Sequence, residues 1–220
     1  MHHDILVFDE VGDLAVAAAE YVADRARRAV VQRGVCNLAV SGGRTPVAMF
    51  RELVRCDVPW ESMVIFQVDE RIAPLGDSDR NLTMLRETLE GVRAVIESMP
   101  VDDPDPDEAA RLYAALLPER FDLVHLGLGT DGHTASLVPG DPALEIDDCL
   151  VAVTNPYQGR RRLTFTYRAL SRADDFLWLV SGVEKRAALS MLLDADHSIP
   201  AGRVTGSHSL IMTERAALCS

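Results

Sequence analysis

The sequence predicts an α/β fold of three layers, in which helices cover both faces of a mainly parallel sheet. Short apolar runs alternate along the chain with segments whose apolar residues recur every three or four positions, which is the spacing of one helix face. Strands that are apolar throughout are typical of parallel sheets buried on both sides. The alternation resumes unchanged after an acidic, proline-rich connector at residues 100–106. We therefore expect residues 1–220 to form one domain.

The first half of the chain contains three predicted strands, each followed by a predicted helix. In chain order these are a strand at residues 5–8, a helix at 9–33, a strand at 35–40, a helix to about 54, a strand at 62–68 and a helix to about 89. Gly34 is expected to end the first helix, because glycine readily takes the left-handed conformation that follows many helices. Thr45 is expected to cap the second helix, with Pro46 in its first position. Asp77 or Ser78 is expected to begin the third.

The second half adds further strands to the same pattern. The expected elements are a helix at residues 106–117, strands at 121–128, 149–153, 163–166 and 176–180, a helix at 183–194 and a last strand at 208–212. Asp105, Pro106 and Glu108 indicate a helix start, as a cap, a first-position proline and an acid that reaches back. Residues 163–166 alternate as a half-exposed strand would.

Four polar loops directly follow predicted strands. They begin at Ser41, Asp69, Gly127 and Ser181. The carboxyl ends of parallel strands meet at one edge of a sheet, which is where open α/β sheets bind their ligands. We therefore expect these loops to converge.

The first loop, Ser41-Gly42-Gly43-Arg44-Thr45-Pro46, places paired glycines between a strand and a helix N-terminus. Free N–H groups and the helix dipole favour an anion there, and a tight turn that simply needs glycine is the alternative. The loop is not a Walker A motif, because it lacks the G-x-x-x-x-G-K-[ST] pattern. The second loop, Asp69-Glu70-Arg71, is either a solvated corner or part of a site.

The third loop lies in a segment from Gly127 to Gly140, in which Asp131 and His133 are two residues apart. Histidine suits a general base because its ordinary pKa is about 6.5, and Asp131 is placed to orient the imidazole. The alternative is a loop histidine bonded to the backbone. The other histidines have no such context, and His125, inside an apolar strand, is interpreted as a core residue.

Other chemistries find no support in the spacing of the residues. The sequence has no H-E-x-x-H, C-x-x-C or EF-hand pattern, and neither Ser41 nor Ser136 lies in a G-x-S-x-G frame. We expect no metal and no other cofactor. The four cysteines are far apart, and free thiols are expected.

The charge balance also excludes some partners. With 22 Lys and Arg against 34 Asp and Glu, the formal net charge is −12, which disfavours a nucleic-acid or anionic membrane surface. A few local arginines are still enough for a phosphorylated metabolite. No apolar segment approaches the roughly 18 residues that span a bilayer, and the first residues lack a signal-peptide pattern. We expect a cytoplasmic monomer.

Taken together, the motifs resemble those of the glucosamine-6-phosphate isomerase/6-phosphogluconolactonase family. The matching segments are residues 41–46, Asp69-Glu70-Arg71, Asn81, residues 127–137, residues 162–166, Glu184-Lys185, Pro200 with Arg203-Val204, and residues 214–217. The resemblance covers nearly the whole chain in the right order. It implies a three-layer α/β/α fold with a mainly parallel sheet, shared with glucosamine-6-phosphate deaminases (NagB) and related to ribose-5-phosphate isomerases (RpiA).

Two segments resemble the lactonases and differ from the deaminases. Deaminases carry D-E-Y where this chain has Asp69-Glu70-Arg71. They continue D-G-H with A-F-N-E-P, where this chain reads Ala135-Ser136-Leu137-Val138-Pro139. Both differences favour a lactonase.

The resemblance implies hydrolysis of 6-phospho-D-glucono-1,5-lactone to 6-phosphogluconate, in the oxidative pentose phosphate pathway. His133 would take a proton from the attacking water and return it to the ring oxygen, while Asp131 holds the imidazole. The residues expected to bind the substrate or its phosphate are Ser41, Gly42, Gly43, Arg44, Thr45, Asp69, Arg71, Asn81, Gly129, Arg162, Lys185 and Arg203.

The chain also departs from the family pattern. Val138 stands where the family usually has Phe, and Tyr157-Gln158-Gly159 replaces a loop that is often proline-rich. The run Arg160-Arg161-Arg162 leaves open which arginine faces the ligand, and register favours Arg162. The alternative functions are a deaminase-like enzyme of the same fold and a non-catalytic sugar-phosphate sensor.

Overall fold

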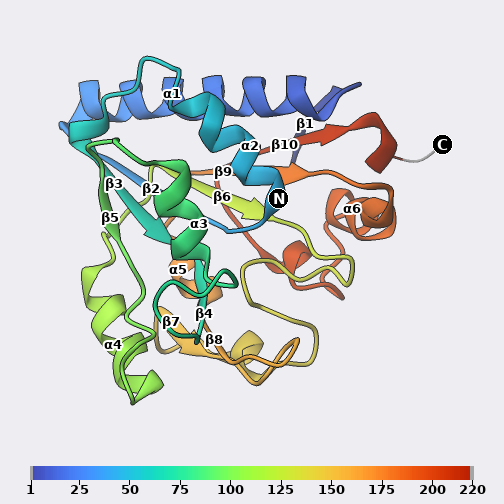
Figure 1. Cartoon of the computed structure of the whole chain (residues 1–220). Helices are drawn as coiled ribbons and strands as arrows, with labels where there is room; N and C mark the ends of the chain where they lie inside the picture. Colours follow the sequence, from blue (N-terminus) through green and yellow to red (C-terminus); the bar gives the residue numbers. More distant parts are fainter. Residues whose placement is uncertain (1, 219–220) are drawn as a thin grey trace.

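The computed structural model describes residues 2–218, apart from the side chain of Arg44. Within that range, the central sheet has seven strands in the order β1-β10-β9-β6-β2-β3-β5 (Figure 1). Their bounds are β1 Asp4–Phe8, β2 Cys36–Val40, β3 Met63–Gln67, β5 Val95–Glu97, β6 Leu123–Gly127, β9 Asp175–Val180 and β10 His208–Glu214. Every pairing in it is parallel, which confirms the predicted sheet.

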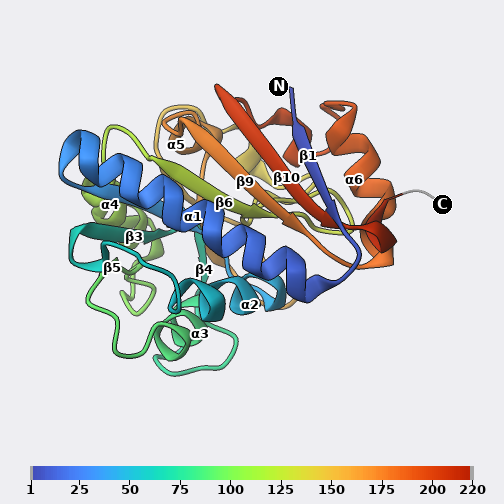
Figure 2. The ribbon, with the colours of Figure 1, turned by 90° about the horizontal axis from the view of Figure 1, so that it is seen from above.

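Helices cover both faces of this sheet. One face carries α1 (Val11–Arg33), α2 (Arg44–Leu53) and α3 (Asn81–Thr88), and the other carries α4 (Pro106–Leu116), α5 (Tyr167–Leu170) and α6 (Arg186–Leu193). Figure 2 shows α1 lying across the strands. Side chains alternate along each strand, so Leu38 packs with the first group while Ala39 packs with the second. The three-layer prediction is confirmed.

A second, antiparallel sheet was not predicted. Its order is β4 (Asp69–Arg71), β8 (Arg162–Phe165) and β7 (Val151–Val153). The first of the two alternatives for residues 69–71, a solvated corner, is therefore wrong. The expectation of a half-exposed strand near residue 163 is also wrong, since every residue of β8 is buried. Because the register places Arg71 opposite Arg162, this small sheet brings two distant cations together.

The helix starts show where local patterns succeed and fail. Gly34 ends α1 with φ of 79° as predicted, and Asp105 caps α4 by accepting the N–H groups of its first turn. Thr45 does not cap α2, because the helix already begins at Arg44 after Gly43. α3 begins at Asn81 and not at residue 77 or 78. No helix in the described part of the chain is long and apolar enough to cross a membrane.

Candidate active site

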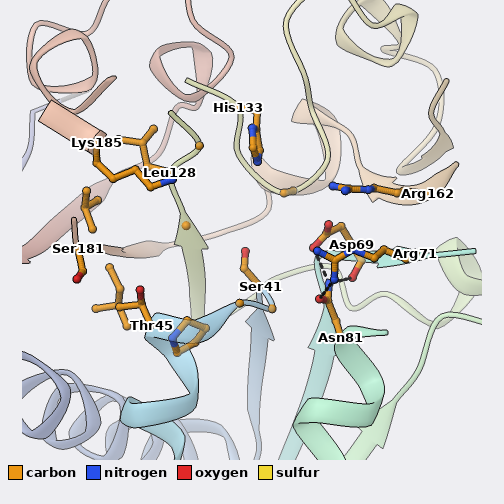
Figure 3. Close-up of a pocket in the computed structure, with 18 of the residues that line it drawn as sticks. Ser41, Thr45, Asp69, Arg71, Asn81, Leu128, His133, Arg162, Ser181 and Lys185 are labelled. Carbon is orange, nitrogen blue, oxygen red and sulfur yellow. Dashed lines mark hydrogen bonds between the residues drawn. The ribbon is translucent and has the colours of Figure 1, made fainter. Parts of the chain in front are cut away.

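A cleft of about 290 Å³ lies at the carboxyl ends of four neighbouring strands, β9, β6, β2 and β3 (Figure 3). The loops that follow these strands supply its walls, which confirms their predicted convergence. The sequence-predicted residues that line it are Ser41, Gly42, Gly43, Thr45, Asp69, Arg71, Asn81, Gly129, His133, Arg162 and Lys185.

The loop after β6 holds the imidazole of His133 against the carboxylate of Asp131. Nδ1 of His133 lies 2.5 Å from Oδ1 of Asp131, and the backbone N–H of His133 donates to the same oxygen at 3.2 Å. The loop closes on itself, because the Gly129 N–H donates to the His133 carbonyl at 2.8 Å. A Cβ on Gly129 would lie 2.1 Å from His133 Nδ1. A residue without a side chain is therefore required beneath the imidazole.

The Asp131 carboxylate also fixes the proton on the imidazole. Partial burial raises the pKa of Asp131, but the charge of His133 and its hydrogen bonds outweigh this effect and hold the pKa below its ordinary value. An ionised carboxylate only accepts hydrogen bonds, so Nδ1 of His133 is the donor, and in the neutral imidazole Nε2 is then the nitrogen with the lone pair. The ring extends into the cleft (Figure 3). This is the arrangement of a general base with an orienting group.

The turn between β2 and α2 offers a surface for an anion. Gly43 precedes the helix with φ of 119°, and no described side chain caps it. The buried hydroxyl of Ser41 lines the cleft and has no hydrogen-bond partner in the described part of the chain. An open helix N-terminus beside a free hydroxyl suits a phosphate or carboxylate. Gly42 allows this turn to touch the neighbouring helix, since a Cβ there would lie 1.9 Å from Asn81 Oδ1.

One hydrogen-bonded network organises the wall made by β4 and β8. The Ser136 hydroxyl donates to Asp69 Oδ2 at 2.6 Å and accepts from Arg162 Nη1 at 3.3 Å. Asn81 donates to Asp69 Oδ1 at 3.2 Å and accepts from Arg71 Nη1 at 3.1 Å. Both oxygens of Asp69 are thus engaged, and this buried carboxylate positions the two arginines through neutral residues. Burial lowers the pKa of Arg162 from its ordinary value, but an arginine remains charged in proteins.

Glu70 anchors the helix that carries Asn81. Its side chain is fully buried, and its Oε1 accepts the backbone N–H groups of Arg71 and Asn81, each at 2.8 Å. Its Oε2 accepts the N–H of Leu82 and the amide of Gln67, also at 2.8 Å. A carboxylate at a helix N-terminus satisfies N–H groups that lack partners within the helix. This anchor explains why α3 begins at residue 81.

The remaining predicted cations are divided between the cleft and the surface. Lys185 lies on the wall formed after β9, across the cleft from Arg162 (Figure 3). Arg203 is not brought to the cleft: its Nη1 donates to Glu145 Oε1 at 2.9 Å. The side chain of Arg44 lies outside the described residues.

Two residues of the site were missed by sequence reasoning. Ser136 belongs to a recognised motif, but nothing in the sequence shows that its hydroxyl joins Asp69 to Arg162. Tyr157 lies in the loop before β8 and belongs to no recognised motif, and its hydroxyl donates to Asp131 Oδ2 at 3.2 Å. Only the three-dimensional arrangement identifies these contacts.

The described residues include no cluster of three or more His, Cys, Asp or Glu side chains able to hold a metal. Within the same range, Cys36, Cys56 and Cys149 are free thiols, and Cys219 lies outside the described residues.

Comparisons with known proteins give a consistent result. Residues 9–212 match the family model described as glucosamine-6-phosphate isomerases/6-phosphogluconolactonase. A 6-phosphogluconolactonase from Synechocystis sp. is 36% identical over 200 residues, which cover 84% of this chain and 82% of the relative. The crystal structure of a 6-phosphogluconolactonase from Shewanella baltica superposes with a TM-score of 0.88 at 26% identity, covering 97% of this chain and 98% of that one. A monomeric glucosamine-6-phosphate deaminase has the same fold, with a TM-score of 0.87 at 18% identity, covering 97% and 98% of the two chains.

Proposed function

The chain belongs to the glucosamine-6-phosphate isomerase/6-phosphogluconolactonase family, and from this premise we propose that His133 is the general base of a lactone hydrolysis carried out in the cleft. The reaction is the hydrolysis of 6-phospho-D-glucono-1,5-lactone to 6-phosphogluconate in the oxidative pentose phosphate pathway. The observation that carries the proposed role is the Asp131–His133 pair. Nδ1 of His133 faces the carboxylate, which leaves Nε2 for the substrate in a cleft that Arg71, Arg162 and Lys185 also line.

The catalytic steps need only groups that the cleft contains. Nε2 of His133 takes a proton from a water molecule while the oxygen of that water forms a bond to C1 of the lactone. The bond between C1 and the ring oxygen then breaks, and the imidazolium returns the proton to that oxygen. Asp131 stabilises the imidazolium between these steps, because its negative charge lies against Nδ1. One water is consumed and one carboxylic acid is formed.

We place the substrate phosphate among Arg71, Arg162, Lys185 and the N-terminus of α2. These groups line the same cleft as His133, so one phosphorylated sugar bound there would contact the cations and the base. Arginine contacts phosphate with two parallel hydrogen bonds, and the helix N-terminus supplies backbone N–H donors. The unpartnered hydroxyl of Ser41 is a further donor to the ligand.

The proposal is tested with His133→Ala. A general base contributes roughly 10²- to 10⁴-fold in rate, so the variant should lose that factor in kcat for the lactone, measured above the spontaneous hydrolysis. His197→Ala is the matched control, because His197 is exposed and outside the cleft. Full lactonase activity in His133→Ala would remove the proposed base. Release of ammonia from glucosamine 6-phosphate by the unmodified protein would instead indicate a deaminase.

We also propose that residues 1–220 act as one domain, as a cytoplasmic monomer with no nucleic-acid partner and no cofactor. In support, both sheets contribute to the same cleft, and the net charge of −12 opposes binding to polyanions. Light scattering of the purified protein tests the monomer, and a mass of twice 24.1 kDa would contradict it.

A further inference from the structure

A short hairpin carries Tyr157 to the catalytic pair. The backbone groups of Tyr157 and Arg160 exchange hydrogen bonds, at 2.9 and 3.3 Å, around a turn in which Gln158 and Gly159 have φ of 52° and 81°. The hairpin is fastened on its far side, since Arg160 pairs with Asp77 and Asp79 at 3.0 and 3.1 Å. The backbone hydrogen bonds within the hairpin and the ion pairs of Arg160 together fix the position of Tyr157.

Tyr157 makes three separate contacts in the site. Its hydroxyl donates to Asp131 Oδ2 at 3.2 Å, the carboxylate oxygen that His133 does not use. Its ring meets the imidazole of His133 edge to face, with centroids 5.4 Å apart and planes at 67°. The Arg162 guanidinium lies over the same ring, 5.1 Å from its centroid. One side chain thus contacts the proposed base, its orienting carboxylate and a proposed phosphate ligand.

We propose that Tyr157 is a positioning residue for the Asp131–His133 pair, and this inference rests on the proposed function. Its hydroxyl holds the carboxylate so that Oδ1 faces Nδ1 of the imidazole, and its ring limits rotation of that imidazole. Partial burial and the charge of Asp131 raise the pKa of Tyr157, so the phenol stays protonated as a donor. The Asp131 side chain is 34% exposed, and without Tyr157 its second oxygen would be held by mobile water.

A Tyr157→Phe substitution isolates the contact with Asp131, because it removes only the hydroxyl that donates to Oδ2. The charged side chains that line the cleft beside this contact are Asp69, Arg71, Arg162, Glu184 and Lys185. All of these remain unchanged in a Tyr157→Phe variant.

The chain contains a matched control at the opposite end of the sheet. Tyr21 donates to Asp175 Oδ2 at 2.8 Å, His208 Nδ1 lies 2.6 Å from the other oxygen of Asp175, and the Arg25 guanidinium lies 5.2 Å from the Tyr21 centroid. These four residues share the tyrosine–carboxylate–histidine hydrogen bonds and the stacked arginine, although Arg25 also donates to the Tyr21 hydroxyl, and none of them lines the cleft. Tyr21→Phe therefore removes an equivalent hydroxyl without touching the proposed machinery.

The test compares kcat and KM of Tyr157→Phe, Tyr157→Leu and Tyr21→Phe in lactone hydrolysis. For Tyr157→Phe we expect kcat to fall about five-fold, which corresponds to the roughly 1 kcal/mol of one hydrogen bond. KM should stay within about two-fold, because the substitution removes no proposed contact with the phosphate. Tyr157→Leu should lower kcat further because the ring contact is also lost, and Tyr21→Phe should keep the wild-type kcat and KM.

Three results would overturn the inference. They are a wild-type kcat in Tyr157→Phe, a change in KM alone, or an equal loss of kcat in Tyr21→Phe. The activity of His133→Ala separates this outcome from the larger proposal: if that variant is inactive while Tyr157→Phe is normal, only the role of Tyr157 fails.

Discussion

His125 should make the protein less stable in acid, by an amount that the structure allows to be calculated. It lies on β6 directly beneath the active-site turn, with its Nδ1 3.3 Å from the backbone N of Ser41 and its ring at the edge of Phe50. The side chain is completely buried. Desolvation lowers its pKa from 6.5 to about 3, because a charged imidazolium has no compensating partner there.

The sign of the effect follows from proton binding in the two states. Between pH 3 and 6.5 the unfolded chain binds a proton at His125 that the folded chain does not bind. The free energy of unfolding therefore falls as the pH falls through this window, by up to about 1.4 kcal/mol per pH unit. Integrated from pH 7 to pH 5, the loss from this one residue is about 2 kcal/mol.

His125→Leu removes this loss, and urea unfolding at pH 7 and pH 5 measures it. Replacing the ring also changes the packing, but that change is the same at both pH values and cancels in the difference. We expect the drop in unfolding free energy between pH 7 and pH 5 to be about 2 kcal/mol smaller in the variant. The exposed His197 supplies a control, since His197→Leu should leave the drop unchanged. An identical drop in His125→Leu and the parent would refute the reasoning.

Three further substitutions test the walls of the cleft. Arg71→Ala should raise KM for the lactone at least about ten-fold with a smaller effect on kcat, because charged hydrogen bonds contribute roughly 1.5–3 kcal/mol; an unchanged KM would remove Arg71 from the phosphate site. Gly129→Ala should lower kcat nearly as far as His133→Ala, since its Cβ would overlap the imidazole, and normal turnover would contradict this. Glu70→Gln should lower the melting temperature by at least about 5 °C in calorimetry, because the anion that anchors Asn81 becomes neutral. An unchanged melting temperature would show that the charge of Glu70 does not stabilise the fold.

The parallel sheet and the position of the cleft were predictable because they depend on repeated patterns. Apolar strands such as residues 123–127 are distinct from helices with three- and four-residue spacing. Once the strands are parallel, the loops at Ser41 and Gly127 must lie at the same edge. No detailed packing is needed for either conclusion, and the structure confirms both.

The second sheet was missed because β4 is too short and too polar to form a pattern, although strands were predicted at residues 149–153 and 163–166, where β7 and β8 lie. β4 consists of Asp69, Glu70 and Arg71, which have poor strand propensity, and its pairing with β8 joins residues more than 90 positions apart. Tertiary packing decides such strands. The start of α3 was misplaced for the same reason, because the buried carboxylate of Glu70 selects Asn81 over the better local caps at residues 77 and 78. Tyr157 gave no signal at all, since its importance lies in a contact with Asp131 across 26 residues.

The two segments that favour a lactonase over a deaminase turn out to be parts of one network. Ser136 stands at the position where the deaminase motif has Phe. Its hydroxyl joins Asp69 Oδ2 to Arg162 Nη1. Arg71, where deaminases have Tyr, contacts Asn81 on the other oxygen of the same aspartate. Asp69 is 7% exposed and Arg162 is 5% exposed. A Phe at position 136 alone would remove the hydroxyl that joins these two buried charged groups. Losing a hydrogen-bond partner of a buried charge lowers the stability of the folded protein. The two lactonase-like differences therefore meet at Asp69, since Ser136 contacts one of its oxygens directly and Arg71 contacts Asn81 on the other.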